Sequence, residues 1–253
     1  MNELFPFHLI ELPETTSTND EVKRRLSCYD DKILVVSALS QTAGRGQKGN
    51  KWESNPCENL LFSIGIKPRF LPPRCQFILL QAASLAVCRA LNQYANGFKI
   101  KWPNDIYYGE RKISGTLIEV ELHGNNISQC VLGTGINLNQ TSFSSYPPNP
   151  ISLKMITGRH VEPNQVLSVI VSYFASYYSM LEQDEGDSIR EQYCGLLFRR
   201  EGFHAYRDGN GVFSARLERV EPDGYLLLRD TDGHLRRYGF KEVRFVLNSL
   251  ECN

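Results

Sequence analysis

The sequence predicts an α+β protein in two parts, and three patterns support this prediction. Apolar runs typical of buried strands alternate with helical patterns up to about residue 200. The stretch from Arg74 to Tyr94 is apolar nearly all round, which predicts a central core helix. From Gly202 the chain changes to short apolar runs separated by glycine-containing turns, which predicts a small β-barrel or sandwich. We therefore expect domains over residues 1–200 and 201–253.

The bulk composition is that of an ordinary globular protein. The 253 residues are 42% hydrophobic and 22% charged, and 28 basic side chains balance 28 acidic ones. Zero net charge disfavours a nucleic-acid-binding protein, which usually carries a basic excess. Seven cysteines without a CxxC pair argue against a disulfide framework or a zinc site. The chain start lacks a signal-peptide pattern, and the apolar run 77–91 is interrupted and too short to span a bilayer. We expect a cytoplasmic protein.

The individual elements follow from local patterns. A capping box of Thr18 and Glu21 predicts a helix start, and Pro13 is expected to end the first strand. The expected strands cover residues 7–12, 32–39, 60–66, 98–101, a stretch up to 121, and 127–132. The expected helices cover residues 18–26, 74–94, 163–181 and 188–198.

A glycine-rich loop at residues 41–52 is the strongest local signal. It alternates glycines with cations and ends in an indole: Gly44, Arg45, Gly46, Lys48, Gly49, Lys51 and Trp52. Glycine allows backbone N–H groups to approach an anion, and successive N–H groups form a concavity for it. The loop therefore suggests a nucleotide or adenylate site. Strands on both sides would anchor it as a lid that orders on binding.

Three other interpretations of this loop are compared with a nucleotide site. The spacing Gly44-x-Gly46-x-x-Gly49 matches a dinucleotide fingerprint, but no helical pattern follows before Pro56. A kinase glycine loop would carry valine where Lys51 stands. A solvated basic surface loop remains an alternative.

Three further polar groups accompany predicted strands and the first helix. Pro103 fixes the direction of Asn104 and Asp105 after a strand, although a tight turn explains the same residues. Lys112 is either a solvated strand-edge lysine or a cation that points into the same cavity as the loop. Ser17 and Thr18 either cap the helix or hold a polar ligand at its start.

Taken together, these segments resemble biotin protein ligases, the biotin–[acetyl-CoA-carboxylase] ligases. The resemblance covers residues from about 8 to 250, and the order of its two Trp-containing motifs is highly specific. The segments are Ser17–Asn19, Gln41–Trp52, Lys101–Asp105, Arg111–Gly115 and Gly133–Asn137. The family's fold is a mixed β-sheet with flanking helices, a class II synthetase-like catalytic domain, followed by an SH3-like β-barrel.

The resemblance implies a two-step reaction. Biotin and ATP, with Mg²⁺, give biotinyl-5′-AMP and pyrophosphate, and a lysine of a biotin carboxyl carrier domain then attacks the mixed anhydride. Ligases that double as repressors carry an N-terminal winged helix-turn-helix, whereas only sixteen residues precede Ser17 here. We expect the short form, a monomer or homodimer, with no DNA and no membrane among its partners.

The resemblance also implies residue roles, with no metal-ligating residue among them. Two anions meet when a carboxylate attacks an α-phosphate, so the reaction needs cations such as Arg45 and Lys112. The implied catalytic residues are Arg45, Lys112 and Asp105. The implied biotin-binding residues are Ser17, Thr18, Asn19, Gln41, Gly44, Arg45, Lys112, Gly115, Gly133 and Gly135. The implied nucleotide-binding residues are Arg45, Lys51, Trp52, Asn104, Lys112 and Asn137.

Three rival functions stay open at this point. A lipoate or octanoate ligase or transferase shares the fold, but an Arg-Arg-x-x-Gly-Gly-type loop would be expected and is absent, with Gln47 at a position that is arginine in some relatives. A non-catalytic biotin or nucleotide sensor would need neither Arg45 nor Lys112. A DNA-binding repressor is disfavoured by the neutral charge.

Overall fold

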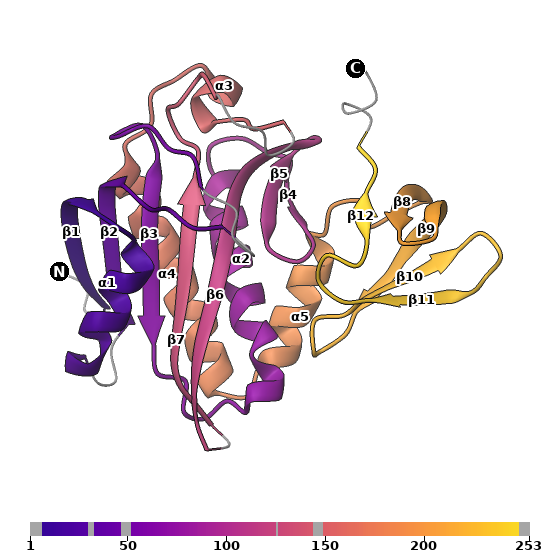
Figure 1. The fold of residues 1–253 in the computed structure, drawn as a ribbon, viewed down its shortest axis with the longest axis horizontal. Helices are drawn as coiled ribbons and strands as arrows, with labels where there is room; N and C mark the ends of the chain where they lie inside the picture. Colours follow the sequence, from indigo (N-terminus) through magenta and orange to yellow (C-terminus); the bar gives the residue numbers. More distant parts are fainter. Residues whose placement is uncertain (1–6, 30–32, 47–51, 125, 144–148, 248–253) are drawn as a thin grey trace.

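The computed structural model describes residues 7–29, 33–46, 52–124, 126–143 and 149–247 (Figure 1). Its larger sheet has seven strands in the order β1-β2-β3-β7-β6-β5-β4. β1 and β2 run parallel, and the other neighbours run antiparallel, which confirms the expected mixed sheet. The strands are β1 (Phe7–Thr15), β2 (Ile33–Gln41), β3 (Leu60–Ile66), β4 (Phe98–Lys101), β5 (Asp105–Tyr108), β6 (Arg111–His123) and β7 (Asn126–Ile136).

Helices cover both faces of this sheet (Figure 1). On one face Val22 of α1 and Leu26, directly after α1, pack against β2 and β7. On the other face α2, α4 and α5 share one large apolar core with β3 and β7. The helices are α1 (Thr18–Arg25), α2 (Phe77–Asn92), α3 (Leu153–Thr157), α4 (Pro163–Glu182) and α5 (Gly186–Gly195), with short 3₁₀ turns at Leu26–Cys28 and Pro73–Cys75.

The central core helix is confirmed as α2. Of its sixteen residues only Arg89 and Asn92 are not buried. With the preceding turn, the segment Pro73–Asn92 is twenty residues long and apolar enough to cross a membrane, so the expectation that it is too short was wrong. However, 78% of the eighteen-residue apolar stretch within this segment is buried inside the protein, which identifies it as a core helix.

The start of the chain differs from the prediction in two ways. β1 continues through Pro13 to Thr15, because β1 is an edge strand and an edge strand tolerates a missing N–H donor. The predicted capping box is also wrong. Ser17 is the N-cap residue of α1 without a side-chain cap, and Glu21 instead accepts a hydrogen bond from the hydroxyl of Thr15 at 3.2 Å.

Two elements were not predicted and one is longer than expected. β5 begins at Asp105, where a turn was expected, and α3 follows the Ser- and Pro-rich stretch. β7 extends through the glycine-rich segment to Ile136 because the whole segment pairs with β3 and β6. Local propensity disfavours glycine in strands, but pairing on both sides overrides that preference here.

The C-terminal part forms a second, five-stranded antiparallel sheet in the order β11-β10-β9-β8-β12, compatible with the expected SH3-like domain. Its strands are β8 (His204–Asp208), β9 (Gly211–Val220), β10 (Leu226–Asp230), β11 (Leu235–Tyr238) and β12 (Arg244–Phe245). It packs directly on the first part: the indole Nε1 of Trp102 donates to the carbonyl of Gly224 at 3.0 Å, and the Trp102 ring lies 5.4 Å from that of Phe240. The exact boundary at 200/201 stays a prediction.

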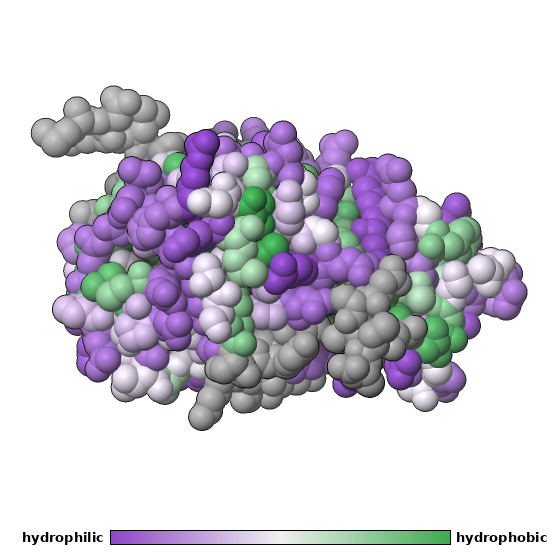
Figure 2. Space-filling model, turned by 90° about the horizontal axis from the view of Figure 1, so that it is seen from above, coloured by the Kyte–Doolittle hydropathy of each residue, from purple (hydrophilic) through white to green (hydrophobic). Residues whose placement is uncertain are grey.

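Seen from above, the surface is mostly hydrophilic, with narrow hydrophobic areas between polar ones (Figure 2). The exposed large apolar side chains are spread over several elements, among them Phe7, Leu39, Leu122 and Leu235. Isolated apolar side chains of this kind are normal on a folded surface.

Candidate functional site

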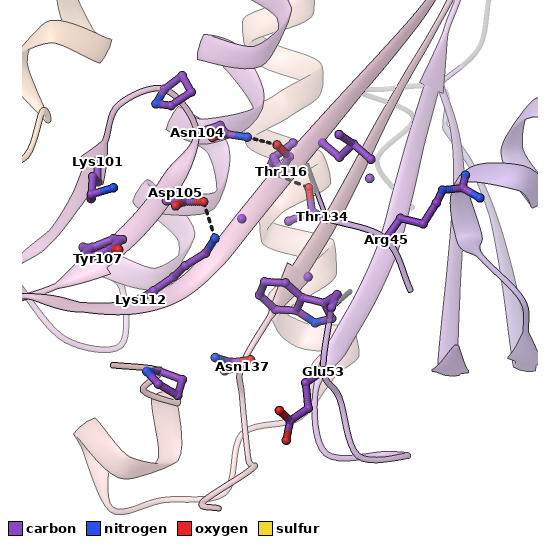
Figure 3. A pocket seen from close by; sticks show the side chains of 18 of the residues that line it. Arg45, Glu53, Lys101, Asn104, Asp105, Tyr107, Lys112, Thr116, Thr134 and Asn137 are labelled. Carbon is purple, nitrogen blue, oxygen red and sulfur yellow. Dashed lines mark hydrogen bonds and ion pairs between the residues drawn. The ribbon is translucent and has the colours of Figure 1, made fainter. Parts of the chain in front are cut away.

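One large cavity, of about 900 Å³, is lined by the N-terminus of α1, the strands β5, β6 and β7, and the C-terminal sheet. Figure 3 shows some of its lining side chains from close by. Most of the predicted site residues line it, although they come from five separate stretches of sequence. They are Ser17, Thr18, Asn19, Gln41, Arg45, Trp52, Asn104, Asp105, Lys112, Gly115, Gly133, Gly135 and Asn137.

One end of the cavity is formed by a hydrogen-bonded polar group. The carboxamide oxygen of Gln41 accepts from the backbone N–H of Thr18 at 2.7 Å and from its hydroxyl at 3.1 Å. The hydroxyl of Ser63 lies 2.7 Å from that of Thr18 and 2.6 Å from Oδ1 of Asn19. All of these side chains except Gln41 are buried, so their mutual bonds offset the cost of desolvation.

Two glycines of β7 make room for the side chains that lie across the strand. A Cβ on Gly133 would lie 1.9 Å from Oδ1 of Asn19, and a Cβ on Gly135 would lie 2.3 Å from Cε2 of Trp52. Neither distance is possible without displacing the neighbour. These glycines are therefore required by the packing of Asn19 and Trp52.

A lysine–carboxylate pair occupies the middle of the cavity (Figure 3). Nζ of Lys112 lies 2.6 Å from Oδ1 of Asp105 and 5.8 Å from the centre of the Trp52 ring. Both charged side chains are about one-fifth exposed, at 19% and 23%. The strand-edge alternative for Lys112 is thus excluded: its ammonium group points into the cavity.

The two predicted asparagines are buried and already bonded to the backbone. Nδ2 of Asn104 donates to the carbonyl of Thr116, and Nδ2 of Asn137 donates to the carbonyl of Ile151 at 3.2 Å. Each amide keeps further hydrogen-bonding capacity for a ligand. The hydroxyls of Thr116 and Thr134 bond each other at 3.0 Å next to Asn104 (Figure 3).

Arg45 lines the cavity, but its guanidinium points away from Lys112 (Figure 3). It forms a bidentate pair with Asp20, with N–O distances of 2.8 and 2.7 Å. The hydrogen bond from Arg45 lowers the pKa of the Asp20 carboxyl, and the same bond raises the pKa of Arg45. The structure therefore separates Arg45 from the other two predicted catalytic residues.

Gly44 is the predicted site residue within the described ranges that does not line the cavity. Gly44 lies behind Trp52, where its carbonyl accepts from the Trp52 N–H at 3.1 Å and a Cβ would lie 3.2 Å from the Trp52 carbonyl. Lys51 lies outside the described residues, as does Gln47.

Sequence reasoning missed several lining residues, above all Lys101. Its Nζ lies 5.2 Å from the ring centre of Tyr107 and 5.0 Å from that of Phe245 in the C-terminal sheet. Burial lowers the pKa of Lys101, although nearby Asp105 opposes this. The sequence feature that could have indicated Lys101 as a lining residue is its position directly before Trp102. The contribution of residues 240–247 depends on how the two parts pack, which no local pattern reveals.

The cavity offers little of its own to a metal ion. Among its described lining residues the carboxylates are Glu53 and Asp105, and Asp105 is paired with Lys112. The cluster with metal-like spacing in the described ranges is Asp230, Asp232 and His234, in a hairpin of the C-terminal sheet. Mg²⁺ usually takes one or two protein carboxylates and otherwise water and substrate phosphates. The residues present fit a magnesium ion that is held mainly by a nucleotide.

The arrangement can bind a ligand with a neutral polar head and an anionic centre. The Thr18–Gln41 end supplies donors and acceptors, Lys112 supplies positive charge, and Trp52 supplies an apolar face. Such a layout suits chemistry in which negative charge develops beside a fixed cation.

Comparison with known proteins gives a consistent result. The family model described as "Biotin/lipoate A/B protein ligase family" matches residues 9–137. The chain is 27% identical over 235 residues to a biotin–[acetyl-CoA-carboxylase] ligase of Paracoccus denitrificans, covering 88% of this chain and 94% of that protein. It is also 27% identical over 248 residues to the bifunctional ligase/repressor BirA of Bacillus subtilis, covering 93% and 74%.

Solved structures support the fold. A biotin protein ligase from Aquifex aeolicus in complex with biotin and ATP superposes with a TM-score of 0.77 at 24% identity, covering 94% of this chain and 99% of that one. At this level of identity the likeness bears on the fold alone.

Proposed function

Because the chain belongs to the biotin/lipoate A/B protein ligase family, we propose that it is a biotin protein ligase. It activates biotin with ATP to biotinyl-5′-AMP and transfers the biotinyl group to a lysine of a carrier domain. The observation that carries this proposal is that one cavity is lined by the Thr18–Gln41 polar group, by Trp52 and by Lys112, whose Nζ lies 5.8 Å from the centre of the Trp52 ring. The name of the Paracoccus relative supports biotin as the acid.

In the proposed binding mode the cyclic urea of biotin occupies the polar end of the cavity. A urea needs both donors and acceptors, and the hydroxyl of Ser17, the Thr18–Gln41 pair and Asn19 provide them in a buried setting. Gly133 and Gly135 leave room above β7 for Asn19 and Trp52, and Gly115 leaves room above β6 for the Asp105–Lys112 pair, so these glycines act on the ligand through the side chains they accommodate.

In the first step the biotin carboxylate attacks the α-phosphorus of ATP and pyrophosphate leaves. The repulsion between two anions is reduced by Lys112, and Arg45 is the second cation assigned to this role. Trp52, Asn104, Asn137 and Lys51 are assigned to the nucleotide. Mg²⁺, when bound with ATP, would neutralise phosphate charge, with Glu53 and Asp105 as the carboxylates within the cavity.

In the second step the ε-amine of a lysine attacks the acyl carbon of the mixed anhydride and AMP leaves. The amine must lose a proton, and Asp105 is the assigned acceptor because its carboxylate lies beside the reacting centre marked by Lys112. A cavity that limits water access also protects the anhydride from hydrolysis.

The wider assignments belong to the same proposal. The carrier is a biotin carboxyl carrier domain of a biotin-dependent carboxylase such as acetyl-CoA carboxylase, in line with the name of the Paracoccus relative. We place the protein in the cytoplasm, as a monomer or homodimer that acts on neither DNA nor a membrane. The zero net charge of the chain supports the part concerning DNA.

Pyrophosphate release from ATP tests the proposal directly. It is measured with Mg²⁺ and either biotin, lipoate or octanoate, first without a carrier and then with one. Release with biotin, followed by label transfer to a carrier lysine, is the expected result. Release with lipoate or octanoate alone would move the protein to the other branch of its family. If the protein binds biotin but releases no pyrophosphate with any of the three acids, it is a non-catalytic sensor.

A further inference from the structure

Glu119 lies outside the cavity but contacts two side chains that line it, Asn19 and Arg45, as well as Lys23. This residue of β6 accepts a hydrogen bond from Nδ2 of Asn19, and its Oε1 lies 3.0 Å from Nζ of Lys23. Its Oε2 lies 3.8 Å from Nη2 of Arg45. The Glu119 side chain is 28% exposed. Strand β6, helix α1 and the segment after β2 therefore meet at one carboxylate.

The contact with Asn19 fixes the direction of a buried amide. An ionised carboxylate can only accept, so the amide nitrogen of Asn19 must face Glu119 and its oxygen must face Ser63. Ser63 in turn lies 2.7 Å from the hydroxyl of Thr18, which donates to Gln41. The carboxylate thus stands at the end of a chain of hydrogen bonds that runs into the polar end of the cavity.

The contact with Arg45 is part of an ionic cluster of Asp20, Lys23, Arg45 and Glu119. Asp20 holds the guanidinium with two hydrogen bonds, and Glu119 lies against the same Nη2 atom. Two anions and two cations balance each other in this cluster. Arg45 is thereby held at the rim, on the side of the cavity where Asn19 lies.

We propose that Glu119 is a positioning residue for the ligase reaction. It sets the donor and acceptor directions presented to a neutral cyclic urea, through Asn19, and it keeps the Arg45 guanidinium at the rim until an anionic ligand replaces the carboxylates. This inference rests on the proposed function for the identity of the ligand. The anchoring of Arg45 does not depend on the proposed function.

If the cluster only stabilised the fold, Glu119→Gln would change thermal unfolding and not recognition of the acid. We expect the reverse. Exposed ion pairs contribute little to stability, so loss of the Glu119 charge should leave thermal unfolding nearly unchanged. If the amide direction matters, a neutral replacement weakens recognition of the acid. A glutamine at position 119 can present either an oxygen or a nitrogen to Asn19, so the direction is no longer fixed.

The first experiment measures the KM for biotin and kcat of adenylate formation in Glu119→Gln. The expected result is a rise in KM of about 10-fold, which corresponds to the loss of one charge-assisted hydrogen bond. The kcat should fall by less than about threefold. Lys23→Ala is the matched control, because it removes the other ion-pair partner and leaves the Asn19 bond intact. Glu121→Gln makes the same chemical change two residues further along β6. Both controls should keep the wild-type KM.

The second experiment needs no substrate. An arginine-specific protease is applied to the ligand-free protein, and cleavage between Arg45 and Gly46 is followed by the masses of fragments 1–45 and 46–253. Release of the arginine from Glu119 should speed this cleavage by about 2- to 5-fold in Glu119→Gln, and Glu121→Gln should match the wild type.

The two readouts separate the possible failures. If the wild-type protein activates another acid, the KM comparison is made for that acid, and only the biotin assignment is lost. If it activates none, the proposed function fails and the protease comparison alone decides on Glu119. A wild-type KM, or wild-type cleavage at Arg45, in Glu119→Gln would overturn the inference. So would an equal rise in KM in Lys23→Ala.

Discussion

Lys112 reaches Asp105 across a glycine. In the pairing of β5 with β6, Asp105 lies opposite Gly115, whereas Lys112 lies opposite Tyr107 beyond a bulge. A Cβ on Gly115 would lie 3.0 Å from both Oδ1 of Asp105 and Nζ of Lys112, so a methyl group there would crowd both members of the pair. The 2.6 Å ion pair in the cavity thus follows from the register of two strands, with a glycine leaving room beside it.

Replacement of Lys112 should remove adenylate formation and leave the fold intact. For Lys112→Ala we expect a loss of about 10²- to 10³-fold in the rate of pyrophosphate release, as for removal of one transition-state charge partner. Single-turnover formation of the adenylate measures this, and circular dichroism checks the fold. Lys99→Ala, on the exposed side of β4, is the matched control. A normal adenylate burst in Lys112→Ala would remove this lysine from the mechanism.

Replacement of Asp105 should separate the two steps. In Asp105→Asn the amine of the carrier loses its proton acceptor, so transfer should slow by about 10²-fold. Adenylate formation, which needs no such acceptor, should fall by less than about tenfold. Each step is measured in single turnover, with preformed adenylate for the second. Asp232→Asn, an exposed carboxylate in the C-terminal sheet, serves as control. Equal losses in both steps would contradict the assignment.

Gly135→Ala should affect the nucleotide more than the acid. The new methyl group would lie 2.3 Å from Cε2 of Trp52 and must displace the indole. Overpacking of this kind costs about 1–3 kcal/mol, so we expect the KM for ATP to rise about 10-fold or more. The KM for biotin should change by less than about threefold.

A second glycine provides the control for this prediction. In Gly65→Ala the methyl group would lie 2.4 Å from Cγ1 of Val22, between β3 and α1 and outside the cavity lining. That variant should lose about 1–3 kcal/mol of stability with an unchanged KM for ATP. A KM for ATP that rises equally in both variants would mean that Gly135 acts through general stability.

The sequence predicted those site residues whose type and spacing are unusual. Gln41, Trp52, Asn104 and Lys112 stand in short stretches that a plain turn or strand does not require, and all four line the cavity. The sequence also predicted those elements of the fold whose hydrophobic pattern is strong, such as the apolar helix α2.

What the sequence could not predict depends on long-range geometry. Glu119 has the pattern of an ordinary strand residue, and its role follows only from the approach of α1 to β6 across a hundred residues. Phe245 enters the cavity because the C-terminal sheet packs beside Trp102. The direction of the Arg45 guanidinium depends on Asp20, which local reasoning treated as part of a helix start.

The buried thiol of Cys88 predicts a loss of stability at alkaline pH. Burial in α2 raises the pKa of this thiol to about 12, from an ordinary value of 9.0. Because the folded pKa is the higher one, the unfolded chain loses its proton first. The contribution to stability is therefore complete below about pH 9 and is lost as the pH rises toward 12. Burial raises the pKa of Cys130 and Tyr107 in the same sense.

Urea unfolding between pH 8 and pH 11 measures this effect. The free energy of unfolding should fall over the upper part of the range, with Cys88 contributing up to about 1.4 kcal/mol per pH unit. Cys88→Ala should be less stable at pH 8, because a buried side chain is shortened, but its stability should fall less steeply above pH 9. Cys57→Ala, which alters an exposed thiol, should keep the wild-type slope. If Cys88→Ala and the wild type fell in parallel up to pH 11, deprotonation of Cys88 would not be coupled to unfolding, and the alkaline loss would have to come from the other buried acids.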